Sequence, residues 1–204
     1  MERVNFAHAL LPYWKKGHWF FEIPPGRSEI HTDLRLDIES VSKDIRLREL
    51  IIEGLADLML EANPDYLVDC RGWTFHWASS IAYKLTEKLG HQVYILDRWD
   101  ESLASYKKVP GRALIFVDIF VLGIEPEWSL EKILEAEVLE PTALVTIVDR
   151  SPGGTFRWHT GNATYPELNV GALVRQSANV YLARDCPECK QGRKFTANPC
   201  IMPG

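Results

Sequence analysis

Acidic, basic and glycine residues follow four of the strands that the sequence predicts. They lie at 69–73, 97–101, 118–125 and 149–154. Asp and Arg side chains in such places could hold hydroxyl groups and anions, and glycines let backbone amides approach a phosphate. In an open parallel sheet, ligands bind in the crevice at the carboxyl ends of the strands. We therefore expect any ligand site of this protein to be built from these four segments.

Short apolar strands alternating with amphipathic helices would position these segments. Strands are predicted at 66–70, 93–96, 113–121 and 143–148, with weaker candidates at 170–174 and 180–182. One helix is predicted to begin at Val41, with Ser40 or Ser42 as its N-terminal cap, and to end at Asn63-Pro64. A second helix is predicted from Trp77 to Leu89, with Gly90 as its C-terminal cap. A third is predicted at 129–138. The first forty residues show no regular pattern. Continuous apolar strands separated by amphipathic helices predict an α/β fold with a parallel sheet covered on both faces.

Composition sets limits on the class of protein. The chain has 204 residues, of which 46% are hydrophobic and 25% charged, as in an ordinary globular domain. Its 28 acidic and 23 basic residues give a net charge of −5, which argues against a basic nucleic-acid-binding face. Its apolar runs are too short to span a bilayer and no signal segment opens the chain, so we expect a cytoplasmic protein that binds no membrane.

The ordered set of segments resembles the type I phosphoribosyltransferases, and orotate phosphoribosyltransferase most closely. Residues 17–20 and 26–28 are similar to a Gly-His-Phe segment and a Gly-x-x-Ser turn of that family, and residues 69–73 lie where it has its pyrophosphate loop. Residues 149–154, Asp-Arg-Ser-Pro-Gly-Gly, look like the family's Asp-Arg-x-x-Gly-Gly loop, whose arginine contacts the orotate base. A segment like 186–192 is found near the C-terminus of some bacterial and archaeal members.

The resemblance implies a type I phosphoribosyltransferase-like fold, with a central mostly parallel sheet flanked by helices and a small hood formed by the N- and C-terminal segments. We expect a single domain over 1–204, with its core at about 41–174 and the hood at about 1–40 and 175–204. The family is usually dimeric, so we expect a homodimer. Its reaction moves ribose 5-phosphate from phosphoribosyl pyrophosphate (PRPP) to a base nitrogen, with Mg²⁺ as cofactor and pyrophosphate as the leaving group.

The segment that should hold the 5′-phosphate departs from the family pattern. Asp118 and Gly123 match it, but Val121 and Leu122 stand where the family has threonines, and Glu125 stands at the serine position. Two like unit charges about 4 Å apart repel by roughly 1 kcal/mol in water and about 4 kcal/mol at an effective dielectric near 20. The carboxylate of Glu125 would therefore oppose a phosphate, and we predict that PRPP does not bind here in the family's way.

Two further loops depart as well. Arg98 matches an arginine of the family's mobile loop, but Trp99 replaces its lysine. Lys107 and Lys108 could approach an anion, although a solvated loop is the simpler interpretation. Trp73 stands in the pyrophosphate loop, where it would either close the pocket or stack on a flat ligand. The candidate catalytic residues are Asp118, Lys107 and Lys108. The candidate ligand-binding residues are Arg71, Gly72, Trp73, Arg98, Gly123, Glu125, Asp149, Arg150, Gly153 and Gly154; a capped turn is an equally good interpretation of the last four.

Three of the four cysteines lie near the C-terminus. Cys186 and Cys189 have the spacing of metal ligands, and Cys200 or Cys70 could supply a third thiolate. No second Cys-x₂-Cys pair follows, and the histidines show no i, i+4 pairing. We therefore favour a tight turn with small buried thiols over a structural zinc site or a disulfide, and we expect no histidine metal site.

Three functions fit these observations. The favoured hypothesis is a phosphoribosyltransferase-like protein with a degraded PRPP site, which is not an enzyme but a ligand-binding, regulatory or assembly module for a nucleobase- or nucleotide-like molecule. The alternative is a divergent active orotate or nucleobase phosphoribosyltransferase that uses Mg²⁺, with Asp118 and Arg150 in adapted roles. In the third hypothesis, the exposed aromatics Trp14, Trp19 and Trp99 bind a protein partner.

Overall fold

The structure is a computed structural model that describes most of the chain. The described residues are 5–21, 30–70, 75–97, 110–121, 139–151, 154–157, 159–160, 163–164, 167–177 and 179–196. The helix predicted at 129–138 lies outside them, as do residues 71–74, 98–109 and 122–125.

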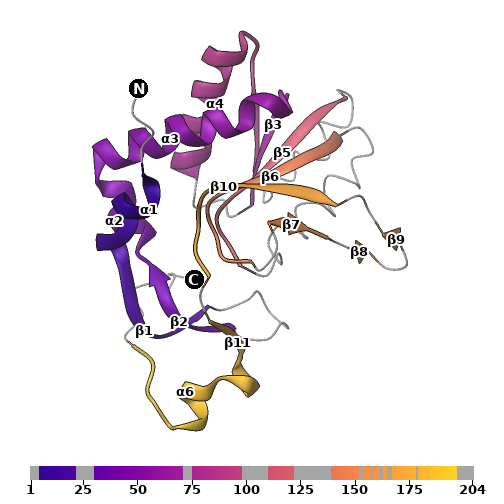
Figure 1. The fold of residues 1–204 in the computed structure, drawn as a ribbon. Helices are drawn as coiled ribbons and strands as arrows, with labels where there is room; N and C mark the ends of the chain where they lie inside the picture. The colour runs from indigo at the N-terminus through magenta and orange to yellow at the C-terminus, as the bar shows by residue number, and fades with distance from the viewer. Residues whose placement is uncertain are drawn as a thin grey trace.

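A six-stranded sheet lies at the centre of the molecule, in the order β4-β3-β5-β6-β10-β7 (Figure 1). Its strands are β3 (Tyr66–Asp69), β4 (Tyr94–Asp97), β5 (Gly111–Phe120), β6 (Leu139–Asp149), β7 (Thr155–Phe156) and β10 (Leu168–Arg175). All neighbours pair in parallel except β7, which runs antiparallel to β10. The predicted α/β fold with a mostly parallel sheet is confirmed. Two short strands, β8 (His159–Thr160) and β9 (Ala163–Thr164), pair separately.

Both faces of this sheet are buried, as the apolar strands predicted. Leu67, Leu114 and Phe116 belong to one core cluster together with the apolar sides of α3 (Ile45–Met59) and α4 (Phe75–Leu89). Val68 and Ile115, one residue further along the same strands, belong to a second cluster. Successive side chains of a strand point to opposite faces, so these two clusters lie on the two sides of the sheet.

The first helical region is divided, and its predicted caps are wrong. It begins at α2 (Ile38–Lys43), and α3 follows after a break at Asp44. The carboxylates of Asp37 and Asp44 accept hydrogen bonds from the backbone N–H groups of Ser40 and Leu47, and so they cap the two helices in place of Ser40 or Ser42. The short η2 helix (Leu60–Ala62) ends this region at Asn63, as predicted.

The first forty residues are not irregular, which corrects the prediction. After α1 (Phe6–Leu10) and η1 (Leu11–Tyr13), β1 (Trp14–Phe21) pairs antiparallel with β2 (Ile30–Leu36). A register shift after Lys16 interrupts the alternation that would have revealed β1 in the sequence.

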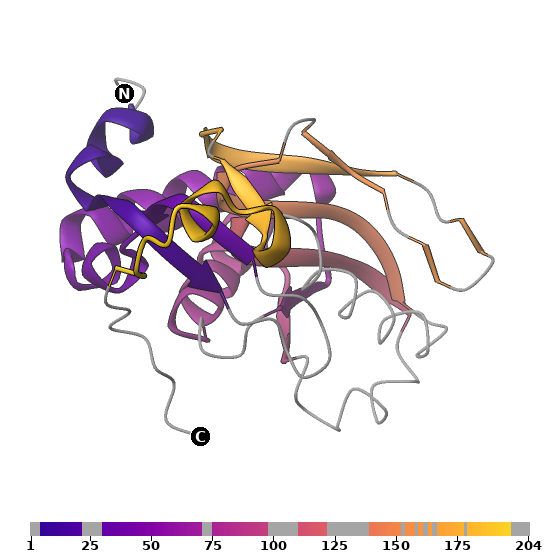
Figure 2. The ribbon, with the colours of Figure 1, turned by 90° about the horizontal axis from the view of Figure 1, so that it is seen from below.

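The C-terminal segment completes this second sheet. β11 (Val180–Leu182) pairs with β2, and η4 (Ala183–Asp185) and α6 (Pro187–Lys190) follow it. Figures 1 and 2 show the yellow C-terminal segment against the indigo N-terminal strands. The two ends of the chain thus form one small sheet, β1-β2-β11, which is the hood. The limits expected for the domain and its core stay a prediction.

Candidate functional site

Three aspartates mark the carboxyl edge of the main sheet. Asp69 ends β3, Asp118 lies near the end of β5 and Asp149 ends β6. All three are buried, with exposed fractions of 1% or less. The Asp118 carboxylate accepts a hydrogen bond from the N–H of Ile119 at 2.7 Å. The structure therefore brings together the strand ends from which the sequence analysis built its site.

Only part of the candidate set can be placed. Asp118, Asp149, Arg150 and Gly154 are described at this edge. The candidates outside the described residues are Arg71, Gly72, Trp73, Arg98, Lys107, Lys108, Gly123, Glu125, Gly153 and Cys200. The ligand-binding roles of all these residues stay predictions.

The carboxylate of Asp149 is occupied by its own fold. One oxygen accepts hydrogen bonds from the backbone N–H and the hydroxyl of Ser151, at 2.8 and 2.6 Å. The other accepts from Nη1 of Arg175 at 2.6 Å, although half of the Arg175 side chain is exposed. Asp149 therefore closes the turn after β6 and holds the end of β10, as expected for a capped turn.

Arg150 is buried against the hood instead of facing an open crevice. Only 5% of the residue is exposed, and its Nη2 donates a hydrogen bond to the hydroxyl of Thr32 in β2 at 2.7 Å. Burial lowers the pKa of Arg150 to about 10, while the nearby Asp33 carboxylate acts in the opposite direction. The guanidinium therefore stays charged at neutral pH. Its Nε has no hydrogen-bond partner among the described residues.

The contact between Arg175 and Asp149 leaves room only for glycine at position 154. Its φ of +70° lies in the left-handed region, and a Cβ atom there would collide with the guanidinium of Arg175. The packing of Arg175 onto Asp149 thus accounts for glycine at this position without any ligand.

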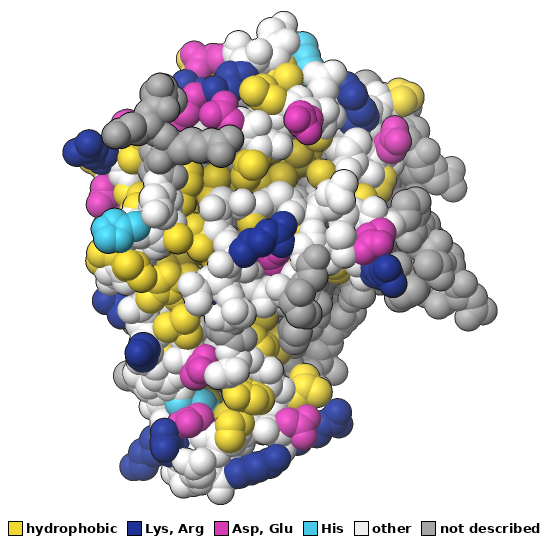
Figure 3. Space-filling model, viewed as in Figure 1, with side chains coloured by type: hydrophobic (Ala, Val, Ile, Leu, Met, Phe, Trp, Pro, Cys, Tyr) yellow, Lys and Arg dark blue, Asp and Glu magenta, His cyan; other side chains and the backbone are white. Residues whose placement is uncertain are grey.

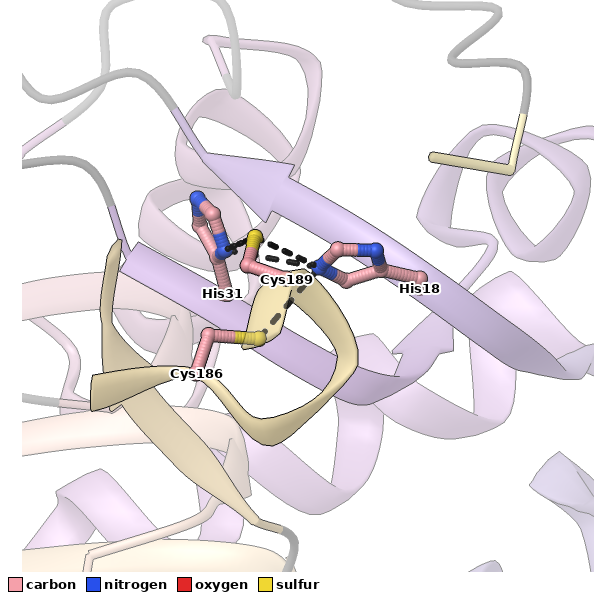
Figure 4. A group of neighbouring side chains, drawn as sticks. All are labelled: His18, His31, Cys186 and Cys189. Carbon is pink, nitrogen blue, oxygen red and sulfur yellow. Dashed lines mark hydrogen bonds between the residues drawn. The ribbon is translucent and has the colours of Figure 1, made fainter. Parts of the chain in front are cut away.

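A second polar cluster lies in the hood, away from the predicted segments. His18 of β1, His31 of β2, and Cys186 and Cys189 at α6 each present one donor atom, and these atoms all lie within 4.8 Å of one another (Figure 4). His18, His31 and Cys186 are buried, whereas Cys189 is exposed. None of the described cysteines forms a disulfide. Among the described residues, this is the group of His, Cys, Asp and Glu side chains that could hold a metal ion.

The sequence analysis missed both histidines of this group. It tested histidine pairing along a helix, whereas His18 and His31 lie on adjacent antiparallel strands. Phe20 is the register partner of His31, and His18 is two residues from Phe20, so His18 and His31 are diagonal neighbours on one face of the hood sheet. A predicted β1–β2 hairpin would have been the signal that joined them.

Solved structures of phosphoribosyltransferases are similar to this chain in fold. Orotate phosphoribosyltransferase from Aeropyrum pernix is 13% identical, with a TM-score of 0.52 over 83% of this chain and 93% of that one. UMP synthase from Leishmania donovani is 18% identical, with a TM-score of 0.56 over 83% of this chain and 35% of that one. Adenine phosphoribosyltransferase from Thermoanaerobacter pseudethanolicus is 13% identical, with a TM-score of 0.51 over 83% and 99%.

The chain has the fold of the type I phosphoribosyltransferases. No protein-family model and no curated protein matches its sequence. At 13–18% identity, the likeness establishes the fold alone.

Two of the tryptophans are part of the core. Trp77 packs in the cluster between α4 and the sheet. Trp19 is only 7% exposed, donates a hydrogen bond to the carbonyl of Lys15 and lies under the guanidinium of Arg35. The expectation that Trp19 is an exposed contact for a partner is therefore wrong. Trp99 lies outside the described residues.

The surface offers a hollow elsewhere on the phosphoribosyltransferase-like fold. A concavity of about 710 Å³ lies between α3 and α4, lined by residues that include Arg46, Leu50 and Tyr83. None of the candidate site residues lines it.

On the face drawn in Figure 3, Lys and Arg side chains lie scattered among Asp and Glu instead of gathering in one basic patch. The described helices are all too short or too polar to cross a membrane.

Proposed function

We propose that this phosphoribosyltransferase-like protein has a degraded PRPP site and acts as a non-catalytic ligand-binding, regulatory or assembly module. The observation that carries the proposal is the burial of Arg150. In the family that the sequence resembles, the corresponding arginine contacts the base. Here its guanidinium is bonded to Thr32 of the hood, and only 5% of the residue is exposed.

The remaining described residues at this edge support the same proposal. The carboxylate of Asp149 is occupied by Ser151 and Arg175, and Gly154 accommodates that arginine. Along the sequence, Val121, Leu122 and Glu125 replace the hydroxyl donors of the phosphate loop by two apolar side chains and a carboxylate. Phosphate binding needs converging N–H and O–H donors, so each of these changes weakens it.

The Mg²⁺ that the resemblance implies finds no set of protein ligands among the described residues. Asp69, Asp118 and Asp149 lie on three neighbouring strands but do not bring their carboxylates within reach of one ion. Mg²⁺ is held by oxygen ligands in a close octahedral arrangement. Because Mg²⁺ is usually held by one or two carboxylates together with substrate phosphates and waters, its binding at this edge stays a prediction.

Calorimetric titration with PRPP and Mg²⁺ tests the proposal. We expect no saturable binding to the natural chain. The matched variant Val121→Thr, Leu122→Thr, Glu125→Ser restores the family's residue types, and we expect it to gain measurable binding. Saturable Mg²⁺-dependent binding of PRPP by the natural chain would overturn the proposal.

The divergent-enzyme alternative has one observation in its favour, which is the retention of a buried acidic residue, Asp118, near the end of β5. It predicts release of pyrophosphate from PRPP with orotate or another nucleobase, and loss of that release in Asp118→Ala. Under the favoured proposal a panel of nucleobases gives no release of pyrophosphate.

Thermal shifts with nucleobases and nucleotides, measured without PRPP, would identify the class of ligand that the module binds. The homodimer and the cytoplasmic location stay predictions, which sizing and fractionation would check.

A further inference from the structure

We propose that His18, His31, Cys186 and Cys189 bind one zinc ion, which joins the N- and C-terminal segments of the hood. This site lies outside the segments that the resemblance marked as functional, and it does not depend on the proposed function.

Four of the six distances between the donor atoms match those of a tetrahedron around zinc, and all six are within 4.8 Å. Ideal Zn–S and Zn–N bond lengths place sulfur and nitrogen ligands about 3.6 Å apart and two nitrogen ligands about 3.3 Å apart. Nε2 of His18 lies 3.4 Å from Sγ of Cys186, 3.6 Å from Sγ of Cys189 and 3.4 Å from Nδ1 of His31. Sγ of Cys189 lies 3.3 Å from Nδ1 of His31. Four of the six edges are thus within about 0.3 Å of the tetrahedral values.

Hydrogen bonds within the cluster do not explain this geometry. Nδ1 of His18 lies 3.2 Å from the carbonyl oxygen of Arg193, which can only accept, so Nδ1 carries the proton. With the proton on Nδ1, an unprotonated Nε2 has a single lone pair, which can accept one hydrogen bond. Three donor atoms nevertheless surround it at 3.4–3.6 Å. One ion at the common centre would satisfy all of these contacts.

The surroundings of the cluster are those of a structural metal site. The contact of His18 Nδ1 with a backbone carbonyl is the outer-shell interaction that fixes the tautomer and orientation of a ligating histidine. The ring of Phe195 packs on both histidines, with centroids 4.3 Å from His18 and 5.0 Å from His31. Figure 4 shows the two histidines reaching the turn at Cys186 and Cys189 from the two strands of the hood.

The donor set selects the metal. Two thiolates and two imidazoles in a tetrahedron suit zinc, whereas Mg²⁺ and Ca²⁺ require oxygen ligands. Two thiolates also neutralise the charge of Zn²⁺, so the complex can be buried at low cost. Four protein ligands leave no open position for a water molecule, and we therefore assign the ion a structural role.

The position of the zinc site connects it to the edge of the main sheet. His31 is followed in β2 by Thr32, which accepts the hydrogen bond from Arg150 at the edge of the main sheet. Fixing His31 to α6 thus also fixes the strand that covers Arg150. Removal of zinc should loosen the hood and uncover this edge.

The test is the zinc content of the untagged full chain, purified under reducing conditions and measured by plasma mass spectrometry. We expect about one zinc per chain, as four-ligand structural sites hold a single ion. Mutation of an outer-shell partner already lowers metal affinity about 10- to 100-fold, so Cys189→Ser, which removes a ligand directly, should lower the zinc content by more than about tenfold. Cys189 is the exposed residue of the four, so its replacement should disturb packing least. The matched control His8→Gln changes an exposed histidine of α1 outside the cluster and should leave the zinc content unchanged.

A second measurement uses the natural chain, so it does not depend on the folding of a variant. Replacing the bound metal by Co²⁺ should give the d–d absorption of a tetrahedral site together with a thiolate-to-cobalt charge-transfer band. The proposal is overturned if the natural chain holds neither zinc nor cobalt after equilibration with either ion, or if Cys189→Ser keeps its full zinc content. A disulfide between Cys186 and Cys189 in freshly prepared protein without zinc would overturn it as well.

Discussion

The carboxyl edge of the main sheet and the hood both gather buried polar side chains, but they satisfy them in opposite ways. At the edge, Asp149 and Arg150 are bonded to other residues of the chain. In the hood, donor atoms of two histidines and two cysteines lie within 4.8 Å of one another. The described side chains of the loop after β6 are thus occupied by internal contacts, whereas the four side chains in the hood form a group that could hold a metal ion.

The two regions are connected. β2 carries His31 toward the cysteines and Thr32 toward Arg150, so one strand serves both regions. The comparison can therefore be tested by disturbing one region and measuring the other.

Removal of zinc from the hood should have the largest effect. A ligand present at a thousandfold excess over its Kd stabilises a protein by about 4 kcal/mol. In a chain of this size that corresponds to a fall in Tm of about 8–16 °C when a chelator is added. Hydrogen exchange should rise in β1, β2 and β11 before it rises in β5 and β6. An unchanged Tm and equal exchange in both sheets would contradict the distinction between the two regions.

Thr32→Val should have the next largest effect, because it removes the partner of a buried charge. Loss of a hydrogen bond to a charged group costs about 1.5–3 kcal/mol. Thr32→Ser keeps the hydroxyl and serves as the matched control. Urea unfolding of both variants measures the difference. If valine and serine destabilise equally, the bond between Arg150 and the hood contributes nothing.

Gly154→Ala should cost about 2 kcal/mol, of which about half is the strain of an L-residue in the left-handed region. Gly90→Ala has the same kind of strain, with φ at +74°, but a Cβ atom there has no neighbour within 4 Å. It should therefore cost only about 1 kcal/mol. The difference in unfolding free energy measures the displacement of Arg175 from Asp149. Equal costs for the two variants would mean that the pair at the edge adds no stability.

The smallest effect concerns the link between the N-terminal segment and α3. The N–H of Leu47 and the hydroxyl of Tyr13 donate to Asp44 and lower the pKa of its carboxyl. A folded-state pKa below that of the unfolded chain adds stability above the unfolded value, and this stability is lost as the pH falls through the folded value. Asp44→Asn keeps the capping oxygen but not the charge. Its Tm should lie below that of the natural chain at pH 7 and converge with it in acid. A constant gap across the acid range would show that Asp44 is not the titrating group.

Local patterns were enough to predict most of the main sheet. The apolar runs of β3, β5 and β6 are buried on both faces, and such strands can be recognised without knowing their partners. Gly90 and Asn63 ended their helices as predicted, because a left-handed residue is a local requirement. The sequence pattern predicts Ser40 or Ser42 as the helix cap instead of Asp37 and Asp44, because the break between α2 and α3 has no clear hydrophobic signal.

The sequence by itself determined the α/β class and the positions of most main-sheet strands along the chain, because each of these follows from residue types within a short stretch. Only the tertiary structure decided which residues meet in the hood. His18 and Cys186 are 168 positions apart, and nothing in either segment identifies the other. Their meeting depends on the register of β1 with β2 and on the return of β11 to the same sheet, which are long-range pairings that no local pattern encodes.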